Sequence, residues 1–390
     1  MIDLQQILKI HSATYKETHR LPLNQLKAIS SIETCRTARL GGHVYECDTC
    51  GETKVVYNSC RNRHCPKCQG LAKESWLEDR KKDLLPIKYF HAVFTIPSEL
   101  NDLSLRNQKS LYSILFRATS ETLMEVSKDP KFLGANIGFM SILHTWGQNL
   151  MHHPHLHCIV TGGGLSSDGA KWIHSRSKFF VPVKVLSKKF RGKFLAYLKE
   201  AYYTNKLKLV GKIDYLSEKF AFQTLIDSLY NKDWVVYCKP PFKDASNVLE
   251  YLGRYTHKVA ISNSRIEHFE NGLVTFKWKD YKDKNKTKHM TLEASEFIRR
   301  FLMHVLPDKF VKIRHYGILS NRNRKLKLEK CKKLTGSIIE KVKAKLSIEE
   351  LMLKVFKKDI ALCPCCSKGK LQKKKRIHPK AYSPPLNNTI

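Results

Sequence analysis

The chain has 390 residues, with 70 Lys and Arg against 35 Asp and Glu and a formal net charge of +35. Its 42% of hydrophobic residues suffices for at least one ordinary core, and its length suits two or three domains. Such an excess of positive charge predicts a polyanionic partner, usually nucleic acid. A membrane partner is not expected, because the sequence has no long apolar run, no basic amphipathic helix and no lipidation motif.

The predicted elements mix helices and strands. Apolar spacing predicts a helix pair up to about residue 30, then a Cys-rich module over 35–70 and a helix ending before Pro86. Strands are expected over 89–97, 138–147, 154–164 and 233–240, with helices over 102–127 and in a Lys-rich stretch up to 230. A helix over 246–260, a hairpin within 272–292 and a helix over 293–305 follow. From residue 320 the chain is basic and helical, and we expect its Pro/Lys-rich tail to be disordered.

Two C-x-x-C pairs, "CDTC" and "CPKC", are separated by 14 residues in the N-terminal region. Two such knuckles complete a tetrahedron around Zn²⁺, and no signal-peptide pattern points to an oxidising compartment where disulfides would form. We therefore expect one structural zinc ion on Cys47, Cys50, Cys65 and Cys68 of a cytoplasmic protein.

Further possible zinc ligands are left open by the sequence. A second site, or alternative ligands for the first, is available from Cys35, His43, Cys60 and His64. The C-terminal "CPCC" has Cys363 and Cys366 in the register of a half-site, which either recruits Cys331 or His378 or binds no metal. Between the knuckles, Arg61 and Arg63 suit contact with phosphates.

The stretch "HHPHLHC" at 152–158 predicts a second kind of metal site. In a strand, His155 and His157 share one face with their Cα atoms about 6.6 Å apart, so both imidazoles can reach one ion. Leu156 and Cys158 then point to the opposite face, towards a core. The plainer alternative is a strand face of solvated histidines.

The stretch "YLGRYTHK" at 251–258 puts Tyr251 and Tyr255 four residues apart, on one face of the expected helix. Taken alone, the stretch is better explained by two tyrosines at the edge of a core, although Arg254 and Lys258 make the local surface basic. Together with a histidine-held metal, the tyrosines suit transesterification of DNA. A tyrosine oxygen would attack a phosphate that the metal polarises and would keep the 5′ end as a phosphotyrosine.

The sequence resembles the two-tyrosine HUH transposases of bacterial insertion sequences that move by a rolling-circle route. The resemblance lies in the Cys-rich segment, in "HAVFTIPSEL", in "LHTWGQNLMHHPHLHCIVTGGGLS", in "YLGRYTHKVAISNSRI" and in "IRHYGILSNRNR". It implies that His155-Leu156-His157 is the HUH motif and that Tyr251 and Tyr255 are nucleophiles. It also implies Mg²⁺ or Mn²⁺ as the catalytic ion, single-stranded transposon ends as substrate, and a bacterial, nucleoid-associated location.

HUH sites usually have a third protein ligand. Gln148 is the first choice here, followed by His144 and then by His153 and His257. An imidazole-rich site favours Mn²⁺ over Mg²⁺.

We therefore expect an α+β protein in three regions. Residues 1–80 would hold a helical segment and a zinc-ribbon-like transposase zinc-binding domain, and residues 85–320 an HUH endonuclease domain with an antiparallel sheet flanked by helices. Residues 321–390 would form a basic helical C-terminal region, with phosphate contacts from "NRNRKLKLEKCKK". A replication initiator or relaxase with the same chemistry and a non-catalytic, zinc-containing DNA-binding regulator are the alternatives. The zinc module argues against the first, and the histidine pair with both tyrosines argues against the second.

Overall fold

The computed structural model describes residues 2–379, except 176–180, 240–241, 243–246, 249–250, 252, 254, 282, 323 and 337–345. The chain forms two compact units, each built from separate stretches of sequence. Unit 1 comprises Met1–Asp79, His257–Val305 and Lys343–Ile390, and unit 2 comprises Arg80–Thr256 and Leu306–Val342. Unit 2 begins near residue 80, but His257–Val305 of the expected 85–320 domain belongs to unit 1, and the expected C-terminal region is divided between the units. The division into three functional regions stays a prediction. Among the described residues, no helix is long and apolar enough to cross a membrane.

Unit 2 is built on a six-stranded sheet. Five strands follow the order β11-β4-β5-β3-β7, and the sixth, β6, pairs with β5. All its strand pairs are antiparallel. The strands are β3 (Tyr89–Thr95), β4 (Asn136–Trp146), β5 (His152–Leu165), β6 (Trp172–His174), β7 (Val236–Lys239) and β11 (Ile313–Gly317). The helices are α4 (Asn101–Arg106), α5 (Gln108–Lys128), α6 (Val183–Tyr203), α7 (Lys219–Tyr230) and α10 (Arg324–Leu334).

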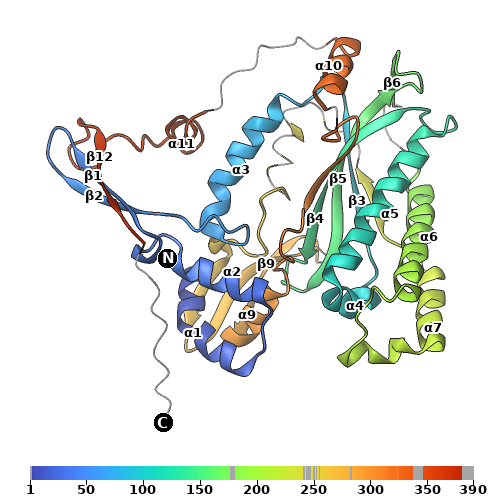
Figure 1. The fold of residues 1–390 in the computed structure, drawn as a ribbon, viewed down its shortest axis with the longest axis horizontal. Helices are drawn as coiled ribbons and strands as arrows, with labels where there is room; N and C mark the ends of the chain where they lie inside the picture. Colours follow the sequence, from blue (N-terminus) through green and yellow to red (C-terminus); the bar gives the residue numbers. More distant parts are fainter. Residues whose placement is uncertain are drawn as a thin grey trace. The chain divides into compact units, whose positions relative to one another are not determined.

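One face of this sheet forms the main hydrophobic core. Side chains alternate between faces along a strand, so Phe94 of β3, Leu143 of β4 and Leu156 of β5 share a face. They are buried in one cluster with Leu115 of α5 and Phe190 of α6. Figure 1 shows α5 and α6 lying along this side of the sheet. The opposite face carries the alternate residues of the same strands.

The predicted helix over 102–127 is two helices, because Asn107 interrupts it with φ −123° and ψ 38°. The Asn107 side chain donates to the carbonyl oxygen of Lys208 at 3.1 Å and accepts from the Lys208 backbone N–H at 2.6 Å. This tertiary contact, which the local sequence does not reveal, explains the break between α4 and α5.

Unit 1 contains a helical part packed on a second antiparallel sheet, with the strand order β10-β9-β8 (Figure 1). The predicted hairpin is β9 with β10, and β8 is an additional strand that the sequence did not predict. The elements of this part are α1 (Leu4–Thr18), α2 (Leu23–Thr34), α3 (Pro66–Lys81), which runs across the unit boundary, β8 (Ile266–Glu270), β9 (Leu273–Asp280), β10 (Lys286–Glu293) and α9 (Ala294–Leu302). Phe297 of α9 packs on Phe276 of β9 with their ring centroids 5.8 Å apart.

The rest of unit 1 is a small sheet with the order β12-β1-β2, together with α11 (Ile348–Phe356). β1 (Gly42–Cys47) pairs antiparallel with β2 (Thr53–Tyr57) and with β12 (Leu371–Ile377). The expectation that the chain is disordered after "CPCC" is therefore wrong for β12, because its backbone hydrogen bonds are satisfied by β1. The remainder of the predicted disordered tail, from residue 380, lies outside the described residues.

Candidate active site

The face of the unit 2 sheet opposite the core brings a group of histidines together on adjacent strands. His155 and His157 of β5 share this face, and His144 of β4 lies directly opposite His155 in the register. The nitrogen atoms that these three residues offer to an ion all lie within 4.8 Å of one another. His144 and His157 are buried and His155 is partly buried, so the group is shielded from bulk water.

Hydrogen bonds orient the three rings. The Nε2 atoms of His155 and His157 lie 3.1 Å apart. Nδ1 of His155 donates to the carbonyl oxygen of His153 at 2.7 Å, so Nε2 is the atom that can offer a lone pair to an ion. Nε2 of His144 similarly donates to the carbonyl oxygen of Tyr255 at 2.8 Å, so its Nδ1 carries the lone pair. Such outer hydrogen bonds are what fix the tautomers of metal-binding histidines.

His144, the second choice for a third ligand, is therefore the residue that the structure places with the pair. Gln148, the first choice, lies in the turn between β4 and β5, and its role stays a prediction. His153 is exposed, with its ring centroid 5.1 Å from that of His155. His257 belongs to unit 1, where its ring packs 5.9 Å from that of Trp76. His152 is only 5% exposed and contacts Ser104 on the core side, so it is a core histidine.

Both predicted tyrosines lie beside the histidine group. Tyr251 and Tyr255 are helical, partly buried, and have their ring centroids 4.5 Å apart, as expected for positions four residues apart in a helix. The ring of Tyr255 lies 4.1 Å from that of His157 and stacks on His144 at 5.4 Å. The helix predicted over 246–260 is described only at some of its positions, and Arg254 lies outside them.

His91 of β3 is a member of this site that sequence reasoning missed. The hydroxyl oxygen of Tyr251 lies 2.8 Å from Nδ1 of His91 and 2.9 Å from its Nε2, and Nε2 also lies 3.0 Å from Nδ1 of His157. Burial, with smaller effects from Lys239 and His155, lowers the pKa of His91 to about 3, so the ring is neutral at neutral pH. A neutral imidazole donates one hydrogen bond and accepts one, which suits a bridge between a tyrosine and a metal-binding histidine. The sequence feature that could have revealed it is a polar histidine among the apolar residues of this strand.

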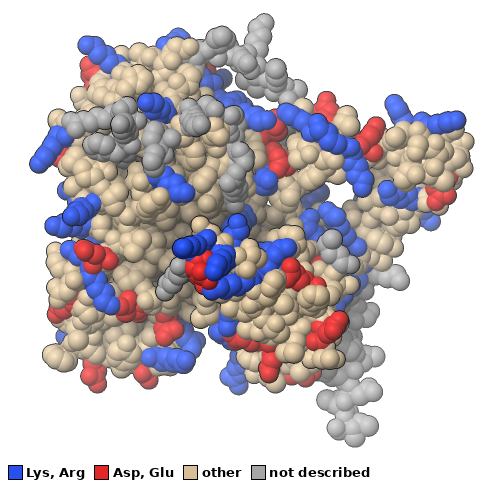
Figure 2. All heavy atoms as spheres, turned by 180° about the vertical axis from the view of Figure 1, so that it is seen from behind, with Lys and Arg blue, Asp and Glu red and all other residues tan. Residues whose placement is uncertain are grey.

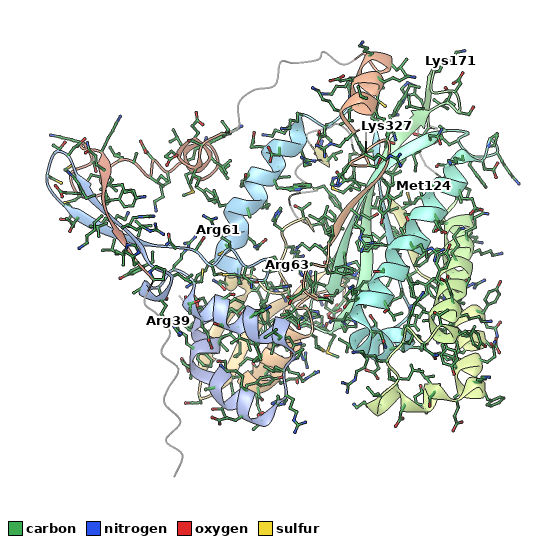
Figure 3. All side chains as sticks on the ribbon, viewed as in Figure 1. Arg39, Arg61, Arg63, Met124, Lys171 and Lys327 are labelled. Atoms are coloured by element: carbon green, nitrogen blue, oxygen red, sulfur yellow. The ribbon has the colours of Figure 1, made fainter. Side chains whose placement is uncertain are left out.

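The basic residues expected to contact DNA are spread over the chain. Arg61 and Arg63 lie near the N-terminal end of α3, and Arg61 is exposed (Figure 3). Lys258 is also exposed. Lys and Arg are the commoner charged side chains in the space-filling view, as the net charge of +35 requires (Figure 2).

The eight cysteines of unit 1 that could bind metal form two groups, each with its ligand atoms within 4.8 Å of one another. The first contains Cys35, Cys60, Cys65 and Cys68, and the second contains Cys47, Cys50, Cys363 and Cys366. This corrects the expected grouping, because the structure does not bring Cys47 and Cys50 together with Cys65 and Cys68. The reason is that Cys65, just before α3, lies beside Cys35, just after α2. Cys47 instead ends β1, whose neighbour is β12.

Comparison with known families matches two parts of the chain. Residues 7–96 match a family model described as "Transposase zinc-binding domain", and residues 138–327 match one described as "Putative transposase". The second match covers the histidine group and both tyrosines, and the first covers the first cysteine group. The chain is thus a transposase with a zinc-binding domain at its N-terminus.

Two relatives place it more closely. A protein of Sinorhizobium fredii (strain NBRC 101917 / NGR234) named "Putative transposase y4qJ" is 46% identical over 373 residues, which are 95% of this chain and 94% of the relative. The "Transposase for insertion sequence element IS801" of Pseudomonas savastanoi pv. phaseolicola is 28% identical over 301 residues, 76% of this chain and 71% of the relative. The chain therefore belongs to the IS91/IS801 family of transposases. No solved structure matches it.

Proposed function

We propose that this transposase nicks and rejoins single-stranded DNA at the ends of an insertion sequence by tyrosine transesterification, as in rolling-circle transposition. The observation that carries the proposal is the position of the two tyrosines. The ring of Tyr255 lies directly against His157, one of three histidines with the spacing of metal ligands, and the ring of Tyr251 packs on His91 and on Tyr255. DNA binding alone needs neither feature. The reaction would take place in the cytoplasm, at the nucleoid.

The donor set fits a divalent cation. His144, His155 and His157 would hold it through the ring nitrogens that carry a lone pair, and three imidazoles suit Mn²⁺ better than Mg²⁺. When bound, such an ion polarises the phosphate that is to be cut. In the first cysteine group, Cys35 and Cys60 lie 3.6 Å from Cys68, sulfur to sulfur, which suits a structural zinc ion of the zinc-binding domain.

The residues of the chain supply the nucleophile and its position. The Tyr251 oxygen forms a bond to the phosphorus at a transposon end, the bond from phosphorus to the 3′ oxygen breaks, and that oxygen leaves as a 3′-hydroxyl that has gained the phenol proton. The 5′ end stays on the tyrosine, so no bond energy is lost and the step can be reversed by a hydroxyl end. His91 holds the Tyr251 hydroxyl at 2.8 Å, which fixes the phenol before it attacks. Tyr255 can accept a second strand while Tyr251 is occupied.

A test uses overlapping single-stranded oligonucleotides that cover both flanks of the gene. With Mn²⁺, wild-type protein should form a covalent protein–DNA adduct on a denaturing gel with those that contain a transposon end, and a chelator should abolish it. Tyr251→Phe combined with Tyr255→Phe should form none, whereas Tyr215→Phe, at a tyrosine that is 56% exposed on the core side of unit 2, should act as wild type.

The outcomes separate the alternatives. Binding of the oligonucleotides without any adduct would favour the alternative of a non-catalytic DNA-binding regulator. An adduct that forms only with a replication or transfer origin, with no joining of transposon ends, would indicate a replication initiator or relaxase. An adduct that persists in the double tyrosine variant would refute the assignment of the nucleophiles.

A further inference from the structure

The C-terminal segment after "CPCC" is attached to the N-terminal hairpin by a regular set of contacts. β12 pairs with β1 from Gly42↔Ile377 to Cys47↔Leu371. Beyond this ladder, the backbone N–H of Asp48 donates to the carbonyl oxygen of Lys370 at 3.1 Å, and the Lys370 N–H donates to Oδ1 of Asp48 at 2.8 Å. Residues more than 300 positions apart in the sequence thus form one small structure.

Four cysteines lie where the two segments meet. The Sγ atoms of Cys47 and Cys366 are 3.7 Å apart, and those of Cys50 and Cys363 are 3.8 Å apart. A tetrahedral zinc ion with Zn–S bonds of about 2.3 Å requires sulfur–sulfur distances of about 3.8 Å. A disulfide requires about 2.05 Å, so the spacing is that of ligands around an ion.

The loops that carry these cysteines have the form of zinc knuckles. The backbone N–H groups of Thr49 and Cys50 point at Sγ of Cys47 from 3.4 and 3.5 Å, and the Gly369 N–H points at Sγ of Cys366 from 3.3 Å. These donors stabilise thiolate sulfurs. Gly369 also packs so closely on the other knuckle that a Cβ atom there would lie 2.4 Å from Sγ of Cys47, so the two loops meet without room for a side chain.

This part of the chain has no apolar core of its own. Every residue of β2 is exposed, and so are all of β12 except its two ends. In the described residues 36–64 the only buried hydrophobic residue is Cys47, and in 357–379 it is Cys363. A small sheet without a core needs another source of stability, and metal binding is the usual one.

We propose that Cys47, Cys50, Cys363 and Cys366 bind a second structural zinc ion, which fastens the C-terminal segment to the N-terminal zinc-binding domain and holds β12 on the edge of β1. Two of its ligands lie outside residues 7–96, the part of the chain that matches the zinc-binding domain family. The site would therefore be completed only after almost the whole chain has been synthesised. The first cysteine group would then be the one that stabilises the fold of the N-terminal zinc-binding domain.

Zinc content of the purified full-length protein, measured by native mass spectrometry, tests the site. Cys363→Ser combined with Cys366→Ser should lose one zinc ion per chain relative to wild type. Cys365→Ser is the matched control, because Cys365 is exposed and lies outside the group, and it should lose none. An unchanged zinc content in the double variant would refute the proposal. The difference between variants cancels any zinc held by the histidine group.

Two further measurements keep the test decisive if the double variant folds poorly. In wild-type protein loaded with zinc, an alkylating reagent should modify Cys365 while sparing Cys363 and Cys366, and a chelator should expose all three. Equal modification before chelation would overturn the proposal. Hydrogen exchange should show the β12 amides protected only while zinc is bound, and protection that survives chelation would mean that zinc does not fasten the strand. None of these readouts needs DNA cleavage, so they stand apart from the adduct test.

Discussion

At the scale of single residues, the candidate site contains one side chain, His91, that sequence reasoning missed. His91 bridges the Tyr251 hydroxyl and the outer nitrogen of His157, and it is only 3% exposed. Residues of this kind orient metal ligands and nucleophiles without touching the substrate, and their loss typically costs 10- to 100-fold in activity or metal affinity. His91 is therefore expected to be a positioning residue.

Replacing His91 by Phe should slow adduct formation by about 10- to 100-fold, because it removes both hydrogen bonds while keeping a ring of similar size. The effect should be larger in a Tyr255→Phe background, where only Tyr251 can react, than in a Tyr251→Phe background. Single-turnover adduct rates in the two backgrounds measure this. His174→Ala, at an exposed histidine of β6 outside the histidine group, is the control and should change neither rate. Equal losses in both backgrounds would mean that His91 acts on the fold or on His157 rather than on Tyr251.

At the scale of elements, the strands of unit 2 position the histidine group, and α5 and α6 pack against their other face. β4, β5 and β3 each present alternate residues to the histidine face, while the intervening residues are held by the core with α5 and α6. Changes that stabilise these helices without touching the histidine face should affect stability alone. α6 offers such a position at Gly192, around which a Cβ atom would meet nothing within 4 Å.

Gly192→Ala should stabilise the protein by about 0.5–1 kcal/mol, because alanine loses less backbone entropy than glycine in a helix. Gly317→Ala should destabilise the protein, because Gly317 has φ +61° and an added Cβ atom would lie 1.9 Å from the carbonyl oxygen of Ile137. Urea unfolding followed by circular dichroism measures both. A neutral or lower midpoint for Gly192→Ala would show that α6 does not limit the stability of unit 2.

At the scale of the whole molecule, the net charge of +35 is the feature that a polyanionic substrate explains best. Lys and Arg residues occur in both units, so we expect DNA contacts outside the unit 2 sheet as well. Arg61 and Arg63 lie between the cysteines of the first group, next to the expected zinc ion. This position suits them to hold phosphates in a defined register.

Arg61→Gln combined with Arg63→Gln should weaken binding of single-stranded DNA of any sequence and make it less salt-dependent. Removing one arginine–phosphate interaction should reduce the slope of log K against log salt by about 0.7. Fluorescence anisotropy at several salt concentrations measures the slope. Lys184→Gln with Lys188→Gln removes the same charge from exposed positions on α6, on the core side of the sheet, and should leave the slope nearly unchanged. Equal changes in both variants would indicate a general charge effect.

Local sequence patterns predicted much of the secondary structure and several residues of the candidate site. Strand alternation places His155 and His157 on one face, helical spacing places Tyr251 and Tyr255 together, and cysteine pairs predict knuckles, because each of these rests on backbone geometry within a few residues. The tertiary structure alone decided which distant elements meet. Pairing of β4 with β5 set His144 opposite His155, and pairing of β3 with β5 brought His91 to His157. Pairing of β1 with β12 divided the four expected zinc ligands between two groups, because strand neighbours are chosen by the whole sheet and not by spacing along the chain.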